Sequence, residues 1–559
     1  MDYQRIFILL GLAVTAYMLI LAWNEDYGQG APRETAIEQA PVTYGNTVPD
    51  MPAPAVTGSG ADGTDVPVLE TSETRQAVSA EPASRQMIQV RTDVLDVTID
   101  PVGGDIVRVS LPAYPTTLDT PDEPFLLVDP RNSYVAQSGL IGPDGTDRQG
   151  RRPLFESDQT HYTLNDADEL VVTLSHRQET GATVIKTFTF RKSDYLIDMG
   201  YRIENATSAP WQGALFTQIK RDSQDPHSTS GNLMGMQPYV GGATRSETEL
   251  YSKLQFDDLE DDSFKETRTD GYMAMVQHYF ISAWVPTQGQ EVTFTARKLK
   301  DRDIYLLGFT TQAIQIQPGE IGSLAARYYA GPKDQYRLQE IAPGLDLTVD
   351  YGFLWWLAQP MFYLLTIIHD LVQNWGIAII CLTIIVKSLL YPLSAASFRS
   401  MAKMRKLQPE MVRLKERYGD DRQKFSQEMM ELYKKEGANP LGGCFPILLQ
   451  MPVFLALYWC LMESVELRQA PFFLWIEDLS AMDPYFVLPI LMGVSMYVTQ
   501  MLQPEPPDPV QAKVFKLMPI MFTFFFLWFP SGLVLYWLVN NCLSILQQLY
   551  VTRQIEKAG

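Results

Sequence analysis

One lysine interrupts an apolar run that is long enough to cross a membrane. The run covers residues 375–392, WGIAIICLTIIVKSLLYP, and Lys387 is its only charged residue. At about 1.5 Å of rise per residue, a helix of this length nearly spans the roughly 30 Å hydrocarbon core of a bilayer. Thr383 and Tyr391 lie four residues to either side of Lys387, so on a helix the three form a polar stripe. A charge at this depth is costly, and the run therefore predicts a membrane span that carries a functional cation.

Lys387 also has a simpler interpretation. It lies near one end of the run, and a lysine there can extend its ammonium to the headgroups without any function. The acids of the following segments favour the functional interpretation, because none falls in the inner half of a predicted span: Glu463, Glu466, Glu477, Asp478 and Asp483. Lys387 thus has no evident counter-ion in the membrane, and this predicts a water-filled pocket around it.

The chain has two halves of different composition. The net charge of the 559 residues is −20, but residues 24–350 alone hold 48 acidic and 27 basic side chains, a net of −21. The remainder is nearly neutral, with long hydrophobic runs. An acidic half of this size excludes nucleic acid as the main partner, because phosphate binding needs concentrated Lys and Arg. The cysteines all lie in the apolar half, so the acidic half has no disulfide framework: Cys381, Cys444, Cys460 and Cys542.

The N-terminal run, residues 6–23, resembles either a signal peptide or a membrane anchor. Its length and the lack of a small-x-small cleavage site before Asn24 favour an uncleaved anchor. Arg5 before the run and Glu25 and Asp26 after it place the N-terminus in the cytoplasm. Residues 24–85 are rich in Pro, Gly, Ala, Ser, Thr and Glu and lack apolar periodicity, which predicts a disordered linker.

Residues 86–350 contain short segments with a period of two, as in Val184, Lys186, Phe188 and Phe190, which would share one face of a strand. Turn residues separate these segments. The pattern predicts one large antiparallel β-sandwich. We find no catalytic residues here, and no metal site is expected, because the histidines lack metal-ligand spacing: His161, His176, His227 and His278. The paired carboxylates of a carbohydrate-processing sandwich cannot be recognised from spacing alone.

Charge asymmetry orients the predicted spans. Residues 395–440 carry 11 Lys and Arg against 7 acids, which places them in the cytoplasm. Their Met and Leu residues recur at helical spacing on both sides of a break near residue 419, which predicts a helical hairpin, either a solvated coiled coil or a docking surface. Residues 351–373 contain Pro360 and two adjacent tryptophans and predict an interfacial amphipathic helix. Residues 374–394 are then the second span, and the acidic sandwich lies outside the cytoplasm.

Four further apolar segments complete a polytopic α-helical membrane protein of six spans. The fifth is short, and polar residues in the sixth serve either as packing contacts or as the lining of a wet cavity. The predicted layout is an anchor (1–23), linker (24–85), sandwich (86–350), interfacial helix (351–373), second span (374–394), cytoplasmic hairpin (395–440), third span (441–463), periplasmic loop (464–484), fourth span (485–503), cytoplasmic loop (504–513), fifth span (514–529), sixth span (532–550) and cytoplasmic tail (551–559).

Four long strings in the second half resemble the YidC/Oxa/Alb family of membrane-protein insertases. They are NPLGGCFPILLQMPVFLALYW (residues 439–459), SVELRQAPFFLWIEDLSAMDPY (464–485), LPILMG (488–493) and FFLWFPSGLVLYW (525–537). The resemblance covers the whole layout, and the N-terminal anchor with its large sandwich is similar to the Gram-negative branch. It implies a bacterial inner-membrane protein with a periplasmic β-supersandwich, cytoplasmic termini, and a hydrophilic groove open to the cytoplasm and to lipid.

The resemblance also implies a function and a site. The implied partners are nascent membrane proteins, the lipid bilayer, the Sec translocon and the translating ribosome, with no cofactor, no catalytic residue and no sequence-specific nucleic acid. The implied groove contains Lys387, Thr383, Tyr536 and Trp537, and Gln450 of the third span joins it as a polar residue. The family residue at Lys387 is usually arginine, and lysine offers a point charge without a bidentate fork.

Two other classes of protein fit parts of the pattern. A solute transporter would show internal repeats, broken helices and an ion pair at the midplane, none of which the sequence contains. A membrane-tethered carbohydrate-active enzyme would place its chemistry in the sandwich. Insertion of a small membrane protein into vesicles without nucleotide would separate an insertase from both.

Overall fold

The computed structural model describes residues 66–67, 86–148, 151–224, 238–300, 302–418, 421–436, 445–503 and 509–558. The predicted anchor (1–23) lies outside these residues, and so does nearly all of the predicted linker (24–85). Val66 and Pro67 are the described part of that linker. Val66 is 5% exposed and packs against Ile141, Ala214 and Phe216 of the β-domain. At this point an apolar side chain has a hydrophobic surface to pack against, and the disordered linker as a whole stays a prediction.

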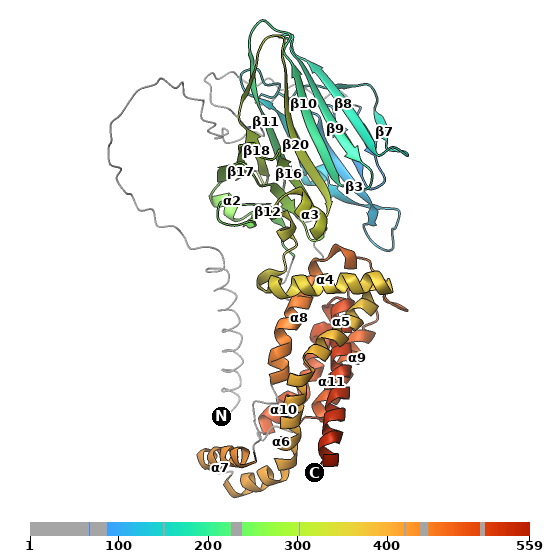
Figure 1. Ribbon diagram of the computed structural model, residues 1–559, viewed down its shortest axis with the longest axis vertical. Helices are drawn as coiled ribbons and strands as arrows, with labels where there is room; N and C mark the ends of the chain where they lie inside the picture. Colours follow the sequence, from blue (N-terminus) through green and yellow to red (C-terminus); the bar gives the residue numbers. More distant parts are fainter. Residues whose placement is uncertain are drawn as a thin grey trace, which may run out of the picture. The chain divides into compact units, whose positions relative to one another are not determined.

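The β-domain is a sandwich of two sheets, as predicted (Figure 1). Within the described residues the first sheet has eleven strands: β14 (Phe264–Arg268), β17 (Val292–Lys298), β18 (Tyr305–Thr311), β11 (Trp211–Arg221), β5 (Val135–Ile141), β3 (Asp105–Pro115), β2 (Asp96–Asp100), β1 (Ile88–Arg91) and β7 (His161–Thr163) in order, with β19 (Ile314–Ile316) beside β11 and β4 (Pro124–Val128) beside β3. The described part of the second sheet has nine: β13 (Ser252–Leu254), β12 (Gly241–Thr244), β15 (Met273–Val276), β16 (Phe280–Pro286), β20 (Ile321–Pro332), β10 (Leu196–Glu204), β9 (Thr183–Arg191), β8 (Glu169–Arg177) and β6 (Glu156–Ser157). The pairing is antiparallel apart from β1 with β7.

The core lies between the two sheets and is built from alternate residues of each strand. In β9 the inward side chains of Val184, Phe188 and Phe190 are buried, and β10 pairs with β9 in register from Ile197 to Glu204. Both sheets contribute to one hydrophobic cluster. A strand whose side chains alternate in this way must bury one face, so the sandwich follows from the predicted pattern.

Lys186 breaks the apolar pattern of β9. It points into the core and is fully buried, with its Nζ donating to three backbone carbonyls: Gly103 O at 2.9 Å, Gly104 O at 2.8 Å and Ser138 O at 3.2 Å. Gly103 and Gly104 have φ angles of 78° and 62°, a left-handed turn that glycine adopts without a Cβ penalty. Burial lowers the pKa of Lys186 to about 7.

The carboxylates nearest to this buried lysine are bound by an arginine. Arg152 forms ion pairs with Asp105 and with Asp147, and all three side chains are nearly inaccessible. The two acids offset the two cations, Lys186 and Arg152, so the polar cluster in the sandwich is close to neutral as a whole. Buried charges are tolerated when an opposite charge lies beside them, and Arg152 has one on each side, Asp105 and Asp147.

Helices follow the sandwich. After the short α2 (Asp258–Asp261) within the β-domain, they are α3 (Gln335–Ile341), α4 (Trp355–Val372), α5 (Trp375–Leu389), α6 (Tyr391–Tyr418), α7 (Arg422–Lys435), α8 (Phe445–Glu463), α9 (Val487–Met501), α10 (Pro509–Phe525) and α11 (Ser531–Ala558). Side-chain caps mark two of the starts: Asp334 accepts from the backbone of α3, and Asn374 accepts from Ile377 N in α5. Helix α4 ends at Gln373, which has a left-handed φ of 55°. Figure 1 shows α4 running crosswise to α8 and α11.

The predicted second span, residues 374–394, is not one straight helix. Helix α5 ends at Leu389, and α6 starts at Tyr391 after a bend of 67°. Pro392 explains the break, because proline lacks a backbone donor and disfavours helical geometry at the residue before it. Tyr391 therefore does not continue the stripe of Thr383 and Lys387, and the expectation that the three share one helix face is wrong.

A helix crosses a membrane by itself only if it is long enough and predominantly apolar. Among the described helices, none is long and apolar enough on its own, whereas the bent pair α5 and α6 meets the requirement together. Helix α9 is a shorter apolar helix.

The helical segments around residues 395–440 and at the C-terminus agree only in part with the predicted boundaries. Helix α6 packs on α7 through Leu407 and Tyr433, and the Tyr433 hydroxyl donates to Met411 Sδ at 2.9 Å. Helix α10 continues into a 3-10 turn, Phe526–Trp528, and α11 follows after Pro530. Helix α11 extends to Ala558, eight residues beyond the predicted end at residue 550, because the chain beyond it contains no proline or glycine before Gly559.

Candidate functional site

Polar side chains from three helices meet around Lys387. Its Nζ donates to Ser544 Oγ of α11 at 2.7 Å and to Gln450 Oε1 of α8 at 3.1 Å. Tyr536 and Asn540 of α11 complete the group. We call these five residues the Lys387 cluster. It joins α5, α8 and α11, which are far apart in the sequence, so its members are brought together only by the packing of the helices.

Hydrogen bonds fix the orientation of the Gln450 amide. Its Nε2 donates to Tyr536 OH at 3.1 Å and to Asn540 Oδ1 at 2.5 Å, while its Oε1 accepts from Lys387. Ser544 Oγ accepts from Lys387 and donates to the Asn540 backbone oxygen at 2.8 Å. Each group thus meets a partner of the opposite kind, and Gln450 connects the cation to the phenol of Tyr536.

Spacing along α11 explains how one helix supplies three members of the cluster. Tyr536, Asn540 and Ser544 are four residues apart, so they lie on one face of the helix, one turn above the other. The sequence analysis treated Asn540 and Ser544 only as polar residues of the last span and missed them as partners of Lys387. The four-residue spacing from Tyr536 is the signal that could have identified them.

The cation is buried and lacks a carboxylate partner. Lys387 is 5% exposed, and in the described part of the chain no acidic side chain forms an ion pair with it. Neutral oxygens satisfy two of its three N–H donors. In this arrangement side chains close over the ammonium. The site can therefore accept one more oxygen atom, or exchange one of its present acceptors for an oxygen of a substrate.

Two predicted site residues have other partners. Thr383 is 1% exposed, and its Oγ1 donates to Ile379 O of its own helix at 2.7 Å. Trp537 packs edge-on against Phe454 at 4.6 Å between ring centroids and lies 5.4 Å from Phe526. The structure thus brings together Lys387, Gln450 and Tyr536 of the predicted set. Trp537 belongs to an adjoining aromatic cluster, and Thr383 lies one turn before Lys387 on α5.

The neighbouring face of α11 binds α9. Asn541 Nδ2 donates to Ser495 Oγ at 3.0 Å, and Gln548 Nε2 donates to Leu502 O at 2.9 Å. Interhelical bonds of this kind are common packing contacts between membrane helices. The polar residues of α11 therefore divide into two sets, one that holds the helix against α9 and one that faces Lys387.

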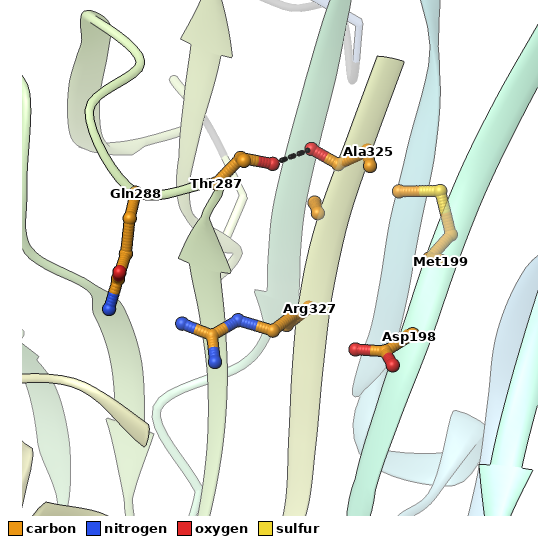
Figure 2. A pocket seen from close by; sticks show the side chains of 7 residues that line it. Asp198, Met199, Thr287, Gln288, Ala325 and Arg327 are labelled. Carbon is orange, nitrogen blue, oxygen red and sulfur yellow. Dashed lines mark hydrogen bonds between the residues drawn. The ribbon is translucent and has the colours of Figure 1, made fainter. Parts of the chain in front are cut away.

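A pocket of about 330 Å³ lies on the second sheet of the sandwich (Figure 2). Its lining is Asp198, Met199, Thr287, Gln288, Ala325, Ala326 and Arg327. Asp198 pairs with Arg191, and Arg327 donates to Ile341 O at 3.0 Å. Asp198 is the single carboxylate of this lining, whereas glycoside hydrolysis needs two. The described residues contain no group of three His, Cys, Asp or Glu side chains that could hold a metal ion. The pocket therefore does not have the groups of a glycosidase or a metal centre.

Comparisons with known proteins agree over the whole chain. Residues 87–364 match a family model described as the YidC periplasmic domain, and residues 367–558 match one described as 60Kd inner membrane protein. A curated protein of Cellvibrio japonicus, named membrane protein insertase YidC, is 53% identical over 563 residues, which cover 100% of this chain and 99% of that protein. Proteins of the same name from Stutzerimonas stutzeri and Marinomonas sp. are 52% and 50% identical, again over 100% of this chain, with 99% and 100% of their own lengths covered.

Proposed function

This chain belongs to the YidC family of membrane protein insertases, and from that premise we propose that the Lys387 cluster shelters the polar end of a segment during insertion. The observation that carries the proposal is a buried cation whose partners in the described part of the chain are side chains of neighbouring helices, with one donor not used by them. Side-chain acceptors can rotate away, so an oxygen of the substrate can replace Gln450 or Ser544 without breaking any backbone structure. The substrate class is a nascent membrane protein whose outer segment is polar and often acidic.

The short helices α5 and α9 support a low free-energy barrier for moving the polar segment across the membrane. Helices α5 and α9 have 15 residues each, which at about 1.5 Å per residue reach about 22 Å, against a hydrocarbon core of about 30 Å. A bilayer that thins to match them presents a shorter apolar barrier. The apolar part of the substrate leaves along the exposed faces of α5 and α10, where Ile384, Ile385, Ile520 and Phe524 are 44% exposed or more.

Burial of the inserted segment supplies the driving force. Each square ångström of apolar surface moved from water contributes about 25 cal/mol, so a spanning segment gains far more than the local cost of passing one polar end. We therefore propose that insertion needs no nucleotide, no cofactor and no covalent chemistry in this protein. The relatives are named as insertases, which agrees with a binding and positioning role.

The proposed topology has six spans in the bacterial inner membrane, with both termini and the α6–α7 hairpin in the cytoplasm and the sandwich in the periplasm. Three aromatic residues of α4, Trp355, Trp356 and Tyr363, are 58–59% exposed, as expected of a helix lying in the interface. The basic α6–α7 segment is the surface that we propose for the ribosome, and the Sec translocon is the proposed partner for larger substrates. Cysteine labels at Arg413 and Asp350 should report opposite sides of the membrane, and labelling of both from the periplasm would overturn this topology.

Reconstituted vesicles test the role of the cation. One substrate is prepared in two forms, with an acidic and with a neutralised outer segment, and insertion is normalised to the amount of protein. We expect Lys387→Arg to insert both forms and Lys387→Ala to lose the acidic form preferentially. Equal losses of both forms would contradict electrostatic shelter and leave Lys387 as an anchor at the headgroups. Wild-type vesicles that carry out solute flux but no insertion would overturn the assignment as a whole.

A further inference from the structure

The C-terminal end of α8 is held by side chains of the β-domain. This end is unfavourable by itself, because the last carbonyls of a helix lack intrahelical donors and its dipole disfavours a negative charge there. The last residue of α8 is nevertheless a glutamate, Glu463, which is 3% exposed. A buried carboxylate at this position requires a partner from elsewhere in the chain.

Lys333 is that partner. It follows β20 directly, and its Nζ donates to Glu463 Oε2 at 2.6 Å and to Thr348 O at 3.3 Å. The side chains of Lys333 and Glu463 are only 2% and 4% exposed, so water screens this ion pair very little. Removing one partner of such a pair leaves an uncompensated buried charge, which is strongly destabilising.

His278 supplies a second contact to the same helix end. Its Nε2 donates to the Met462 carbonyl oxygen at 2.7 Å, and its ring stacks on Tyr279 with 3.7 Å between centroids. Burial lowers the pKa of His278 to about 3, so the ring is neutral and one nitrogen carries the donated proton. The loop after α8 is tied to the β-domain as well, because Arg468 donates to Pro115 O at 2.7 Å.

The helix held in this way also carries an acceptor for Lys387. Gln450 lies thirteen residues before Glu463 on α8, about 20 Å along the helix. A helix transmits a shift or rotation of one end to the other, and a displacement of Gln450 would change the hydrogen bonds that orient the Lys387 cluster. The ion pair and the cluster are thus two contacts on one helix, which also contains Pro452 between them.

We propose that Lys333 and Glu463 form a clamp between the β-domain and α8 that sets the position of Gln450 in the Lys387 cluster. Lys333, Glu463 and His278 are then positioning residues for insertion, with the ion pair of Lys333 and Glu463 as the principal contact. The inference rests on the proposed role of the Lys387 cluster. It adds that the contact of Lys333 with Glu463 acts on the Lys387 cluster through α8. Loss of this contact should lower insertion of acidic and neutral substrates alike.

A charge swap in the full-length protein tests the clamp. Lys333→Glu and Glu463→Lys are each reconstituted alone and then together, and insertion of the acidic and neutral substrates is measured per amount of protein. We expect each single change to lower insertion of both substrates about two- to thirty-fold, the range of coupling between packed sites. The double change should restore most of the loss.

The chain offers a matched control pair. Lys253 and Asp350 also form a 2.6 Å ion pair, but their side chains are 30% and 27% exposed, and within the described residues neither forms a hydrogen bond or ion pair with α8. Lys253→Glu, Asp350→Lys and the double change should leave insertion at the wild-type level. A loss as large as that of the buried pair would show a general effect of charge near the membrane and would contradict the clamp.

A second readout separates positioning from stability. A bifunctional crosslinker joins cysteines introduced at Phe454 of α8 and Trp537 of α11, whose rings are 4.6 Å apart. The rate of crosslinking reports how closely α8 packs against α11. The single charge reversals should change this rate and the double swap should return it. If the reversed variants do not accumulate in the membrane, Lys333→Gln replaces them, with Lys333→Gln/Glu463→Gln as the rescue. Wild-type insertion and crosslinking in every single variant would overturn the clamp, whereas failure of the Lys387 proposal would appear only in the Lys387→Ala comparison.

Discussion

Two of the buried lysines, Lys186 in the sandwich and Lys387 in the helical region, are held in different ways. Lys186 lies between the sheets of the sandwich and donates to three backbone carbonyls, with Asp105 and Asp147 nearby. Lys387 lies in the helical region and donates to two neutral side chains, Gln450 and Ser544. Both are at most 5% exposed, so burial alone does not distinguish them.

The kind of acceptor distinguishes them. Two of the carbonyls that bind Lys186 belong to the turn at Gly103 and Gly104 and the third to β5. These acceptors cannot rotate independently of the backbone, so the role of Lys186 is to hold β9 against the turn. Side-chain amides and hydroxyls rotate in nanoseconds or less, so the partners of Lys387 can be replaced by those of a substrate. A buried cation is thus a candidate site when its acceptors are side chains, and a structural group when they belong to the backbone.

Reversing the charge of Lys387 should have the largest effect on insertion. In Lys387→Glu, repulsion replaces attraction for an acidic substrate; at about 4 Å and an effective dielectric near 20 a unit pair is worth on the order of 4 kcal/mol before desolvation. Insertion of the acidic substrate should fall below that of Lys387→Ala, and the neutral form should suffer less. Lys265→Glu, an exposed change on β14, is the control and should insert normally. Identical behaviour of the two substrates would remove the proposed difference between the two lysines.

Replacing the sandwich lysine should affect stability and not insertion. Lys186→Met leaves the carbonyls of Gly103 and Gly104 without their donor and upsets the charge balance of the buried cluster, which should lower the free energy of unfolding by about 3 kcal/mol. Proteolysis of the full-length protein in increasing denaturant measures this change. Lys192→Met, an exposed change at the end of β9, should be neutral. If Lys186→Met reduced insertion per folded molecule, the division into structural and functional cations would fail.

Removing one acceptor of Lys387 should have a smaller effect. Ser544→Ala deletes an acceptor that the substrate has to displace, a hydrogen bond worth about 1 kcal/mol, so we expect insertion of the acidic substrate to rise up to about fivefold and that of the neutral substrate to stay unchanged. Ser388→Ala is the matched change, because Ser388 Oγ is exposed and donates only to Ile384 O of its own helix. Vesicle insertion assays of the two variants side by side check this. Equal effects would mean that the contact between Lys387 and Ser544 is not used.

The smallest predicted effect is the change of folding stability with pH. The pKa of Lys186 is about 7 in the folded protein and about 10.4 in the unfolded chain, so the unfolded chain binds more protons between these values. Stability therefore rises with pH in this window, by about 1 kcal/mol between pH 7 and pH 8. Denaturant titrations at the two pH values should show the rise in the wild type and lose it in Lys186→Met. A flat profile in the wild type would show that Lys186 stays protonated throughout.

Local patterns predicted the elements better than the contacts between them. Alternation identified β9 and β10, and the buried cation at Lys387 stood out because an apolar run makes one charge conspicuous. The same alternation placed Lys186 on the inner face of its strand, but spacing cannot show which carbonyls fill the space around it. Pro392 was present in the sequence, and its effect on the helix removed Tyr391 from the predicted stripe.

Contacts between distant residues had no local signal. Lys333 and Glu463 are 130 residues apart, and each alone is an ordinary charged residue near the end of an apolar segment. The spacing of Ser544 from Tyr536 assigns both to one face of α11, but the contact of Ser544 with Lys387 depends on the packing of α5 against α11. The resemblance to a family supplied Lys387 and Tyr536, but the hydrogen bonds through Gln450 and Asn540 depend on side-chain geometry that motifs do not encode.

The contact made by Val66 has a mechanical consequence. Between Pro67 and Ile88, the first residue of β1, lie residues 68–87, which can extend to at most about 70 Å. A pull on the chain before Val66 therefore loads the packing of Val66 on Ile141 and Phe216 first, and reaches β1 only after that contact has broken. Strand β1 lies between β2 and the short β7 near the edge of its sheet, where a strand peels most easily. The packing of Val66 therefore bears tension from the N-terminal end of the chain before the sheet does.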